Sequence, residues 1–189
     1  VNGYEGPSGN SLVTQAAVGR NFEIISIPIL ERSDPKNSSR IMVRLLEDGY
    51  ECWLETSEIL GKAYMRDFWQ PNFLSSNYIK SRIPKVLRWL ERASNFPNKY
   101  LWGGTIGPDF DCSGLVQAAF SSEGIWLPRD AYQQENFCTK ITCSLNDFRT
   151  LIPGDLIFFG TQEICNHVAI YLGQGLYCHS SGPSNGSNG

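Results

Sequence analysis

The apolar residues of this chain change their spacing near residue 79, and this change constrains the possible folds more than any other feature of the sequence. Before it, two short runs rich in Ile, Val and Leu at 22–28 and 41–46 are separated by a turn-rich stretch. Polar and apolar side chains alternate over 50–55, as they do on a half-buried strand. These patterns predict a small all-β barrel over residues 1–60.

From residue 79 onward the spacing becomes helical. Apolar residues alternate with charged ones, which predicts an amphipathic helix with Pro84 in its first turn, built on Ile79, Ile83, Val86, Leu87 and Leu90. A second apolar run at 113–122 ends at Gly124, and because it is apolar on nearly every side we expect a buried helix. Residues 61–78 show neither period and are expected to be a connector.

Three strand-like runs follow, at 155–160, 167–172 and 176–179. A tight turn at 173–175 separates the last two, which predicts an antiparallel pair. Helices followed by antiparallel strands indicate an α+β domain over residues 79–189, with the buried helix packed on the sheet.

Charge and composition narrow the classes of partner. The formal net charge is −3 and no cluster of Lys and Arg is present, so we expect neither nucleic acid nor a membrane as a partner. No run of about 18 apolar residues is available to span a bilayer. The six cysteines are irregularly spaced, which favours reduced thiols and a cytoplasmic location; a disulfide set is the alternative. Because Val1 is not an initiator methionine, we expect an incomplete N-terminus.

Cys112 stands at the predicted start of the buried helix. The partial positive charge and free N–H groups of a helix N-terminus favour the thiolate, the form of cysteine that attacks carbonyl carbon. The chain has only two histidines, His167 and His179, on the two predicted strands that flank the tight turn. We therefore expect their imidazoles to be cross-strand neighbours joined by a hydrogen bond. His167 would take the thiol proton and His179 would orient its ring, as in a cysteine hydrolase.

A zinc site is an alternative use of the same region, because Cys165 and Cys178 lie beside the histidines in the sequence. Zinc ligands usually come in pairs about two to four residues apart, and Cys138 and Cys143 are too widely spaced for one such pair. We therefore expect no metal. The simplest alternative is that each histidine is an ordinary polar residue at the end of a strand.

Longer motifs surround these residues. They are Tyr-Leu-Trp-Gly-Gly at 100–104, Asp-Cys-Ser-Gly at 111–114, and the segments 153–159, 167–173 and 179–182. With the order Cys112, His167, His179, they resemble the NlpC-type papain-like cysteine peptidases over about residues 80–182. The β-rich front and the segment 127–134 make the chain most similar to the cyanobacterial members that cut murein peptides between γ-D-glutamate and a diamino acid.

The resemblance implies a papain-like catalytic domain preceded by a bacterial SH3-like barrel that walls one end of the cleft. It implies hydrolysis of the γ-D-glutamyl to meso-diaminopimelate bond of a murein peptide with a free N-terminal L-alanine, in cell-wall peptide recycling or turnover and without a cofactor. The catalytic residues would be Cys112, His167 and His179. Tyr100 would help the Cys112 amide to hold the oxyanion. Substrate-binding roles would fall to Asp111, Ser113, Arg129, Asp130 and, from the barrel, Tyr50.

Residue chemistry alone also allows simpler roles at these positions. Asp111 is favoured as the N-cap of the buried helix, Tyr100 can be a core aromatic, and Arg129 can pair with Asp130. Two other functions remain for the whole chain, a cysteine acyltransferase on the same scaffold and a non-catalytic module that binds wall peptides. The resemblance also implies a first barrel strand and further strands after His179 that this sequence does not show, so we expect both domains to be incomplete.

Overall fold

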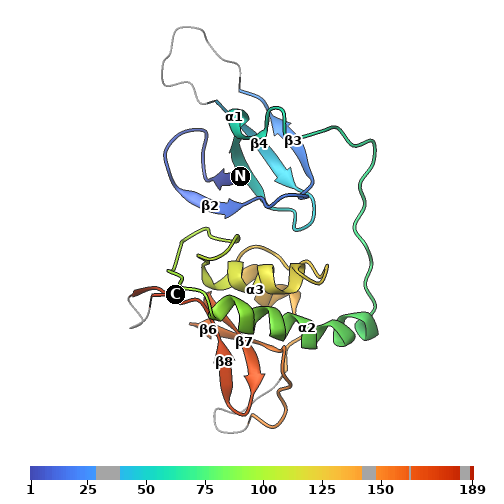
Figure 1. The fold of residues 1–189 in the computed structure, drawn as a ribbon, viewed down its shortest axis with the longest axis vertical. Helices are drawn as coiled ribbons and strands as arrows, with labels where there is room; N and C mark the ends of the chain where they lie inside the picture. Colours follow the sequence, from blue (N-terminus) through green and yellow to red (C-terminus); the bar gives the residue numbers. More distant parts are fainter. Residues whose placement is uncertain (29–38, 142–147, 162, 184–187) are drawn as a thin grey trace. The chain divides into compact units, whose positions relative to one another are not determined.

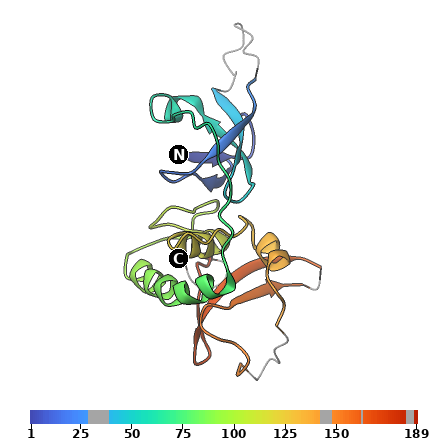
Figure 2. The same ribbon diagram turned by 90° about the vertical axis from the view of Figure 1, so that its right-hand side faces the viewer.

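Five short antiparallel strands build the first of two compact units, residues 1–72 and 73–189, into which the chain divides (Figure 1). The computed structural model describes residues 1–28, 39–141, 148–161, 163–183 and 188–189. In the first unit the sheet bends around its own apolar core (Figure 2). Its strands, in sheet order, are β2 (Leu12–Gln15), β1 (Asn2–Tyr4), β5 (Glu51–Glu55), β4 (Arg40–Leu45) and β3 (Phe22–Ser26).

The alternation of side chains explains how this sheet buries one face. Val43 and Cys52 are paired across β4 and β5, and both are buried. Leu54 is buried and Glu51 is exposed, which confirms the alternation predicted over 50–55. The sequence pattern misses β1 and β2, because runs of three and four residues are too short for a period of two to show.

A four-residue helix, α1 (Thr56–Ile59), follows β5. Residues 60–75, all of which the structure describes, contain no helix or strand, whereas the last three residues of the predicted connector, 76–78, belong to the next helix.

The second unit opens with the long amphipathic helix α2 (Ser76–Ser94). Ser75 caps this helix, because its hydroxyl oxygen accepts the N–H of Tyr78 at 3.2 Å. The helix therefore begins before the apolar spacing does, and Pro84 lies in its interior, so the prediction that Pro84 occupies the first turn is wrong. Pro84 is exposed, and water can reach the Lys80 carbonyl that loses its helical N–H partner.

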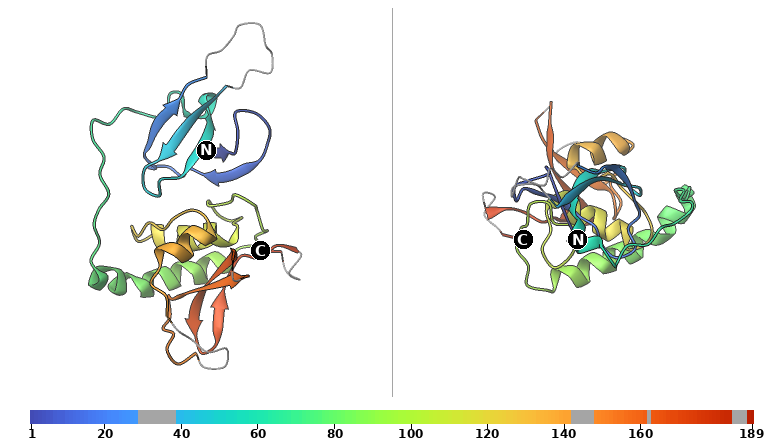
Figure 3. Two further views of the ribbon diagram at one scale, coloured as in Figure 1. Left: turned by 180° about the vertical axis from the view of Figure 1, so that it is seen from behind. Right: turned by 90° about the horizontal axis from the view of Figure 1, so that it is seen from above.

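Two further helices lie against the sheet of this unit. The buried helix is α3 (Cys112–Ser121); it runs beside α2 and contacts β7 (Figure 1), and all its residues except Ala118 and Ser121 are buried, which confirms the prediction. A shorter helix, α4 (Ala131–Phe137), packs on β7 next to α3 (Figure 3, left). The apolar spacing gives no signal for α4, because its segment is largely polar.

The sheet of the second unit has the antiparallel order β6 (Leu156–Gly160), β7 (Cys165–Gly173) and β8 (Leu176–Cys178). Gln174 and Gly175 have φ values of 54° and 79°, as a two-residue type I′ turn requires, so the predicted tight turn is confirmed. Val168 and Ile170 of β7 face the apolar core formed with α2 and α3.

Besides Cys112, three of the described cysteines pack in the apolar cores of the two units. Cys52 lies in the core of the first unit, and Cys165 and Cys178 pack in that of the second. The five cysteines that the structure describes are free thiols, and Cys143 lies outside the described residues.

In the described part of the chain, no helix combines the length and the hydropathy that crossing a bilayer requires.

Candidate active site

Asp111 fixes the start of the helix that carries Cys112. It is the N-cap of α3, and its Oδ1 accepts the N–H of Gly114 at 2.7 Å, so the predicted cap is confirmed. Its Oδ2 accepts the N–H of Gly103 at 2.8 Å. One carboxylate therefore joins the helix to the glycine-rich turn that precedes it.

Glycine is required where this turn meets the helix. A Cβ on Gly114 would lie 1.9 Å from the carbonyl oxygen of Gly104. A Cβ on Gly104 would in turn lie 2.6 Å from the carbonyl oxygen of Asp109. Both obstacles are backbone atoms, which cannot move aside as a flexible side chain can. The two glycines thus permit the close backbone packing that places Cys112.

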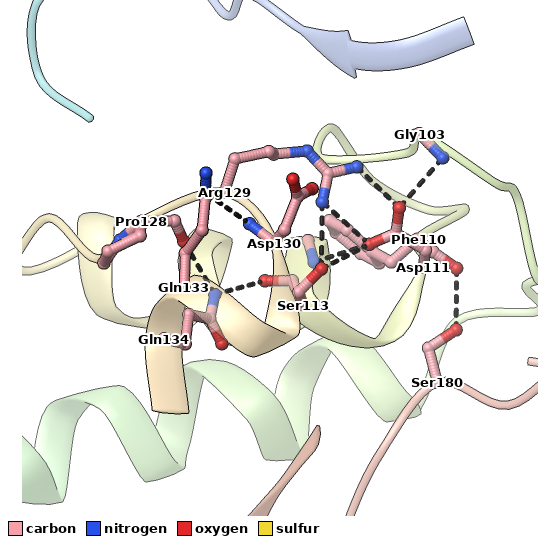
Figure 4. A network of polar contacts seen from close by, with 11 residues as sticks. Gly103, Phe110, Asp111, Ser113, Pro128, Arg129, Asp130, Gln133, Gln134 and Ser180 are labelled. Carbon is pink, nitrogen blue, oxygen red and sulfur yellow. Dashed lines mark hydrogen bonds and ion pairs between the residues drawn. The ribbon is translucent and has the colours of Figure 1, made fainter. Parts of the chain in front are cut away.

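A buried guanidinium completes the support beneath the helix start (Figure 4). Arg129 donates from Nη2 to Oδ2 of Asp111 at 2.5 Å and from Nη1 to Oδ1 at 3.1 Å. Its Nη1 also donates to Oγ of Ser113 at 3.0 Å. Arg129 is 2% exposed and Asp111 is 5% exposed, so the two charges neutralise each other out of contact with water. The structure thus gives both residues, and Ser113, partners within the protein, and their contact with substrate stays a prediction.

Two buried residues to which the sequence assigned no individual role extend this network (Figure 4). Gln134 of α4 donates from Nε2 to the carbonyl oxygens of Ser113 at 3.1 Å and Pro128 at 2.9 Å. Ser180 donates from Oγ to the carbonyl oxygen of Phe110 at 2.7 Å. The α4 helix has a detectable start signal, because Asp130 and Gln133 are spaced as a capping box and the Asp130 N–H donates to Gln133 Oε1 at 3.1 Å. Ser180 lies in the motif at 179–182, but nothing in that motif predicts its hydrogen bond to Phe110.

The two histidines hydrogen-bond to each other as predicted. Nε2 of His167 and Nδ1 of His179 are 2.7 Å apart, and the rings meet edge to face at 80°. The strand register pairs Ile170 with Cys178, so His179, one residue beyond β8, lies opposite Ala169 and diagonal to His167. Diagonal neighbours on one face of a sheet are still within reach of long side chains.

Cys112 lies against β7, the strand that carries His167. The backbone of Val168, the residue after His167, hydrogen-bonds to the Cys112 sulfur, as does the backbone of Ser113. The start of α3 therefore meets β7 next to His167 in the strand, and the catalytic roles of Cys112, His167 and His179 stay a prediction.

The electrostatics of the site differ from the expectation of a resting thiolate. Burial, and then the charge of Asp111, raise the pKa of the Cys112 thiol, although backbone hydrogen bonds and Arg129 act in the opposite direction. Burial also lowers the pKa of His167, with His179 adding to the effect, and burial lowers the pKa of His179. The helix N-terminus therefore does not outweigh desolvation. At neutral pH these directions favour a neutral thiol and neutral imidazoles.

Tyr100 lies close to the nucleophile and keeps its proton. Burial, followed by the charges of Cys112 and Asp111, raises the pKa of its hydroxyl to about 12. Its ring is only partly buried, and Gly182 packs against it. A protonated phenol next to the sulfur can donate a hydrogen bond, as the predicted oxyanion role requires.

The remaining predicted positions lie elsewhere. Asp130 is the N-cap of α4 and is partly exposed. Tyr50 belongs to the first unit, where its side chain packs against the core, and its contact with substrate stays a prediction. Among the described residues, no group of three or more His, Cys, Asp and Glu side chains is arranged to hold a metal ion.

Comparison with known families bears on these features. The NlpC/P60 family matches residues 97–188, and the bacterial dipeptidyl-peptidase SH3 domain matches residues 3–59. The chain joins a bacterial SH3 domain to an NlpC/P60 domain. The α+β fold, with a small SH3-like barrel followed by a papain-like NlpC-type domain, is thereby confirmed. The Cys112, His167 and His179 cluster lies wholly within the NlpC/P60 domain.

Relatives of the NlpC/P60 domain are named as peptidases. A γ-D-glutamyl-L-lysine dipeptidyl-peptidase of Bacillus cereus is 39% identical over 84 residues, which are 43% of this chain and 24% of the relative. A bifunctional muramidase and DL-endopeptidase of Bacillus subtilis, CwlT, is 44% identical over 87 residues, 43% of this chain and 25% of the relative. The solved structure of the peptidoglycan hydrolase RipB from Mycobacterium tuberculosis has a TM-score of 0.48 at 30% identity, covering 61% of this chain and 60% of that one. The chain thus spans about a quarter of the length of these two Bacillus relatives.

Proposed function

We propose that this chain is a cysteine endopeptidase that hydrolyses the bond between γ-D-glutamate and a diamino acid in murein peptides. The observation that carries the proposal is the 2.7 Å hydrogen bond between His167 and His179, on a sheet against which the helix that begins at Cys112 packs. A thiol, a base and a group that orients the base are the minimum set for nucleophilic catalysis.

The hydrogen bond determines which nitrogen of His167 acts. Nε2 of His167 is engaged with His179, so only Nδ1 is available to the thiol. For Nδ1 to accept a proton, the hydrogen of the neutral ring must be on Nε2, where it donates to Nδ1 of His179. His179 then carries its own hydrogen on Nε2. This pair of tautomers keeps the lone pair of His167 Nδ1 available to the thiol.

Because a neutral thiol must lose its proton to attack, we assign His167 the role of general base. Nδ1 takes the thiol proton as the Cys112 sulfur attacks the γ-glutamyl carbonyl carbon. The Cys112 amide and the Tyr100 hydroxyl stabilise the oxyanion. The imidazolium then gives its proton to the leaving amine, and the C–N bond breaks to leave a thioester. Water attacks the thioester while His167 Nδ1 accepts a proton, and the thiol is restored.

The substrate class follows from the relatives. The Bacillus cereus relative is named for γ-D-glutamyl-L-lysine, a D-glutamate linked through its γ-carbonyl to a diamino acid. We extend this to meso-diaminopimelate and to a requirement for a free N-terminal L-alanine, in a reducing compartment such as the cytoplasm. Asp111, Ser113, Arg129, Asp130 and Tyr50 are carried as substrate-binding candidates.

The test is cleavage of L-Ala-γ-D-Glu-meso-diaminopimelate by the full chain, followed by chromatography of L-Ala-D-Glu. Cys112→Ala should reduce the rate to the uncatalysed level, and Cys138→Ala, which removes a free thiol remote from the histidines in the sequence, should not change it. An N-acetylated peptide should be a poor substrate. A Cys112→Ala protein with normal turnover would refute the proposal, and transfer of the acyl group to an added amine in preference to water would favour an acyltransferase.

A further inference from the structure

Two aromatic side chains close a ring around the histidine pair. Phe159 contacts His167 with ring centroids 5.6 Å apart, and Tyr177 contacts His179 at 5.2 Å. Phe159 and Tyr177 also contact each other, at 5.7 Å. With the 5.0 Å contact between the imidazoles, the four rings form a closed cycle in which each touches two others.

The register of the sheet explains why these four residues meet. Phe159 of β6 stands directly opposite His167 of β7. Tyr177 is two residues before His179 along the third strand, so both side chains leave the same face. Ala169 lies on this face between them and is completely buried. Its small side chain leaves room for the rings to reach across β7 and touch.

The geometry suits a protective role. Where two imidazoles are partly exposed, water competes for the nitrogen atoms that form the hydrogen bond between them. Phe159 is 37% exposed and Tyr177 is 45% exposed, so both rings lie at the surface in contact with the imidazoles and are not part of the deep core. Tyr177 meets the His179 ring at 85°, an edge-to-face contact that restrains the plane of the imidazole.

We propose that Phe159 and Tyr177 are positioning residues that hold His167 and His179 in hydrogen-bonding contact and shield that bond from water. The inference rests on the proposed function, because positioning matters only if His167 moves a proton. Both residues act through the imidazoles and touch no reacting atom.

The pKa values of His167 and His179 can report the loss of an aromatic ring that covers them. The titratable side chains on the strands are Cys165 and Tyr171 on β7 and Tyr177 and Cys178 on β8, and β6 carries none. From the helices come Cys112 at the start of α3, with Asp111 and Arg129 behind it, and Glu135 of α4, whose charge acts on Cys165. Burial is the first cause of the lowered pKa of each histidine, and no carboxylate among the described residues contributes to either shift. Removing a covering ring should therefore raise the pKa of both histidines toward the ordinary value.

The experiment compares Phe159→Leu and Tyr177→Leu with two controls in the full chain. Leu176→Ala removes an exposed apolar side chain from the other face of β8, and Tyr177→Phe keeps the ring. With the murein tripeptide, each Leu variant should lose about tenfold in kcat while KM changes by less than about twofold. The acid limb of the kcat/KM profile should move to higher pH. Tyr177→Phe should recover most of the rate, and Leu176→Ala should match the parent chain.

Two results would overturn the inference while leaving the proposed function standing. One is a Leu variant with unchanged kcat and an unchanged acid limb while Cys112→Ala is inactive. The other is that Tyr177→Leu and Tyr177→Phe lower kcat and raise KM to the same extent, which would point to a substrate contact through the hydroxyl. Imidazole ¹⁵N resonances give a readout that does not depend on turnover, because loss of the ring should change the shifts of His167 Nε2 and His179 Nδ1. If Cys112→Ala keeps full activity, the proposed function itself fails.

Discussion

Replacing Arg129 by methionine separates a structural role from a substrate-binding role at this position. Methionine fills similar volume but leaves the Asp111 carboxylate buried without its cation. Breaking a buried ion pair from one side costs about 3–5 kcal/mol. Asp111 keeps the N–H groups of Gly103 at 2.8 Å and Gly114 at 2.7 Å, which offset part of the loss.

We therefore expect Arg129→Met to lower the free energy of unfolding of the second unit by about 3 kcal/mol, the lower end of that range. For a unit of this size the corresponding fall in Tm is about 12 °C. Differential scanning calorimetry of the full chain would measure it. The matched control is Arg88→Met, which removes an exposed arginine from α2 and should change stability by less than about 0.5 kcal/mol.

Adding Asp111→Asn to Arg129→Met removes the isolated charge, so the double variant should be about 1–2 kcal/mol more stable than the sum of the two single changes predicts. An Arg129→Met protein that unfolds within about 1 kcal/mol of the parent chain and shows only a raised KM would refute the reasoning. In that case the guanidinium would serve the substrate and not the fold.

Three further predictions concern the same site. His179→Asn should keep kcat within about tenfold of the parent, because an amide oxygen can still accept a hydrogen bond from His167 Nε2, whereas His179→Ala should lower kcat about 10²-fold. Steady-state kinetics on the tripeptide would distinguish the two variants, and equal losses would argue against an orienting role for His179. Gly114→Ala should lower stability by more than about 2 kcal/mol in urea titration, because its Cβ would meet the Gly104 carbonyl oxygen at 1.9 Å, while Gly6→Ala, with its nearest contact at 3.6 Å, should be tolerated. Because the folded pKa of both histidines lies below 6.5, the unfolded chain binds more protons below that pH, so this contribution to stability is complete above pH 6.5 and is lost as the pH falls through the folded pKa. The Tm of the second unit should therefore fall on acidification, and less steeply in a variant with Gln at both histidine positions.

The parts of the fold that the sequence predicts are those with a clear period or a clear turn. The buried helix follows from an uninterrupted apolar run, and the hydrogen bond between His167 and His179 follows from their places on either side of a two-residue turn. Pro84 misled the prediction because a serine cap two turns upstream sets the true helix start. The balance of charge around Cys112 could not be predicted, since burial is a property of the packed structure.

The Arg129 contact shows the same limit. Sequence proximity suggests Asp130 as its partner, yet the ion pair recorded in the structure joins it to Asp111, 18 residues away. Only the folded path of the chain between the two residues brings these charges together. Phe159 and Tyr177 were also missed, because their contact with the histidines depends on the register of three strands and on a small residue between them.

The close packing of the glycine turn against the start of α3 has a consequence for the order of folding. The contacts that place Cys112 span 8 residues from Gly103 to Asp111 and 18 from Asp111 to Arg129, so they are local along the chain. The contact between sulfur and β7 joins segments much farther apart, and closing so long a loop is slow. We expect the backbone amides of the glycine-rich turn and of the start of α3 to become protected from hydrogen exchange early in refolding, before the strands that carry the two histidines pack against α3. During synthesis, Cys112 would then be positioned at the start of α3 but remain without its general base until β7 and β8 fold.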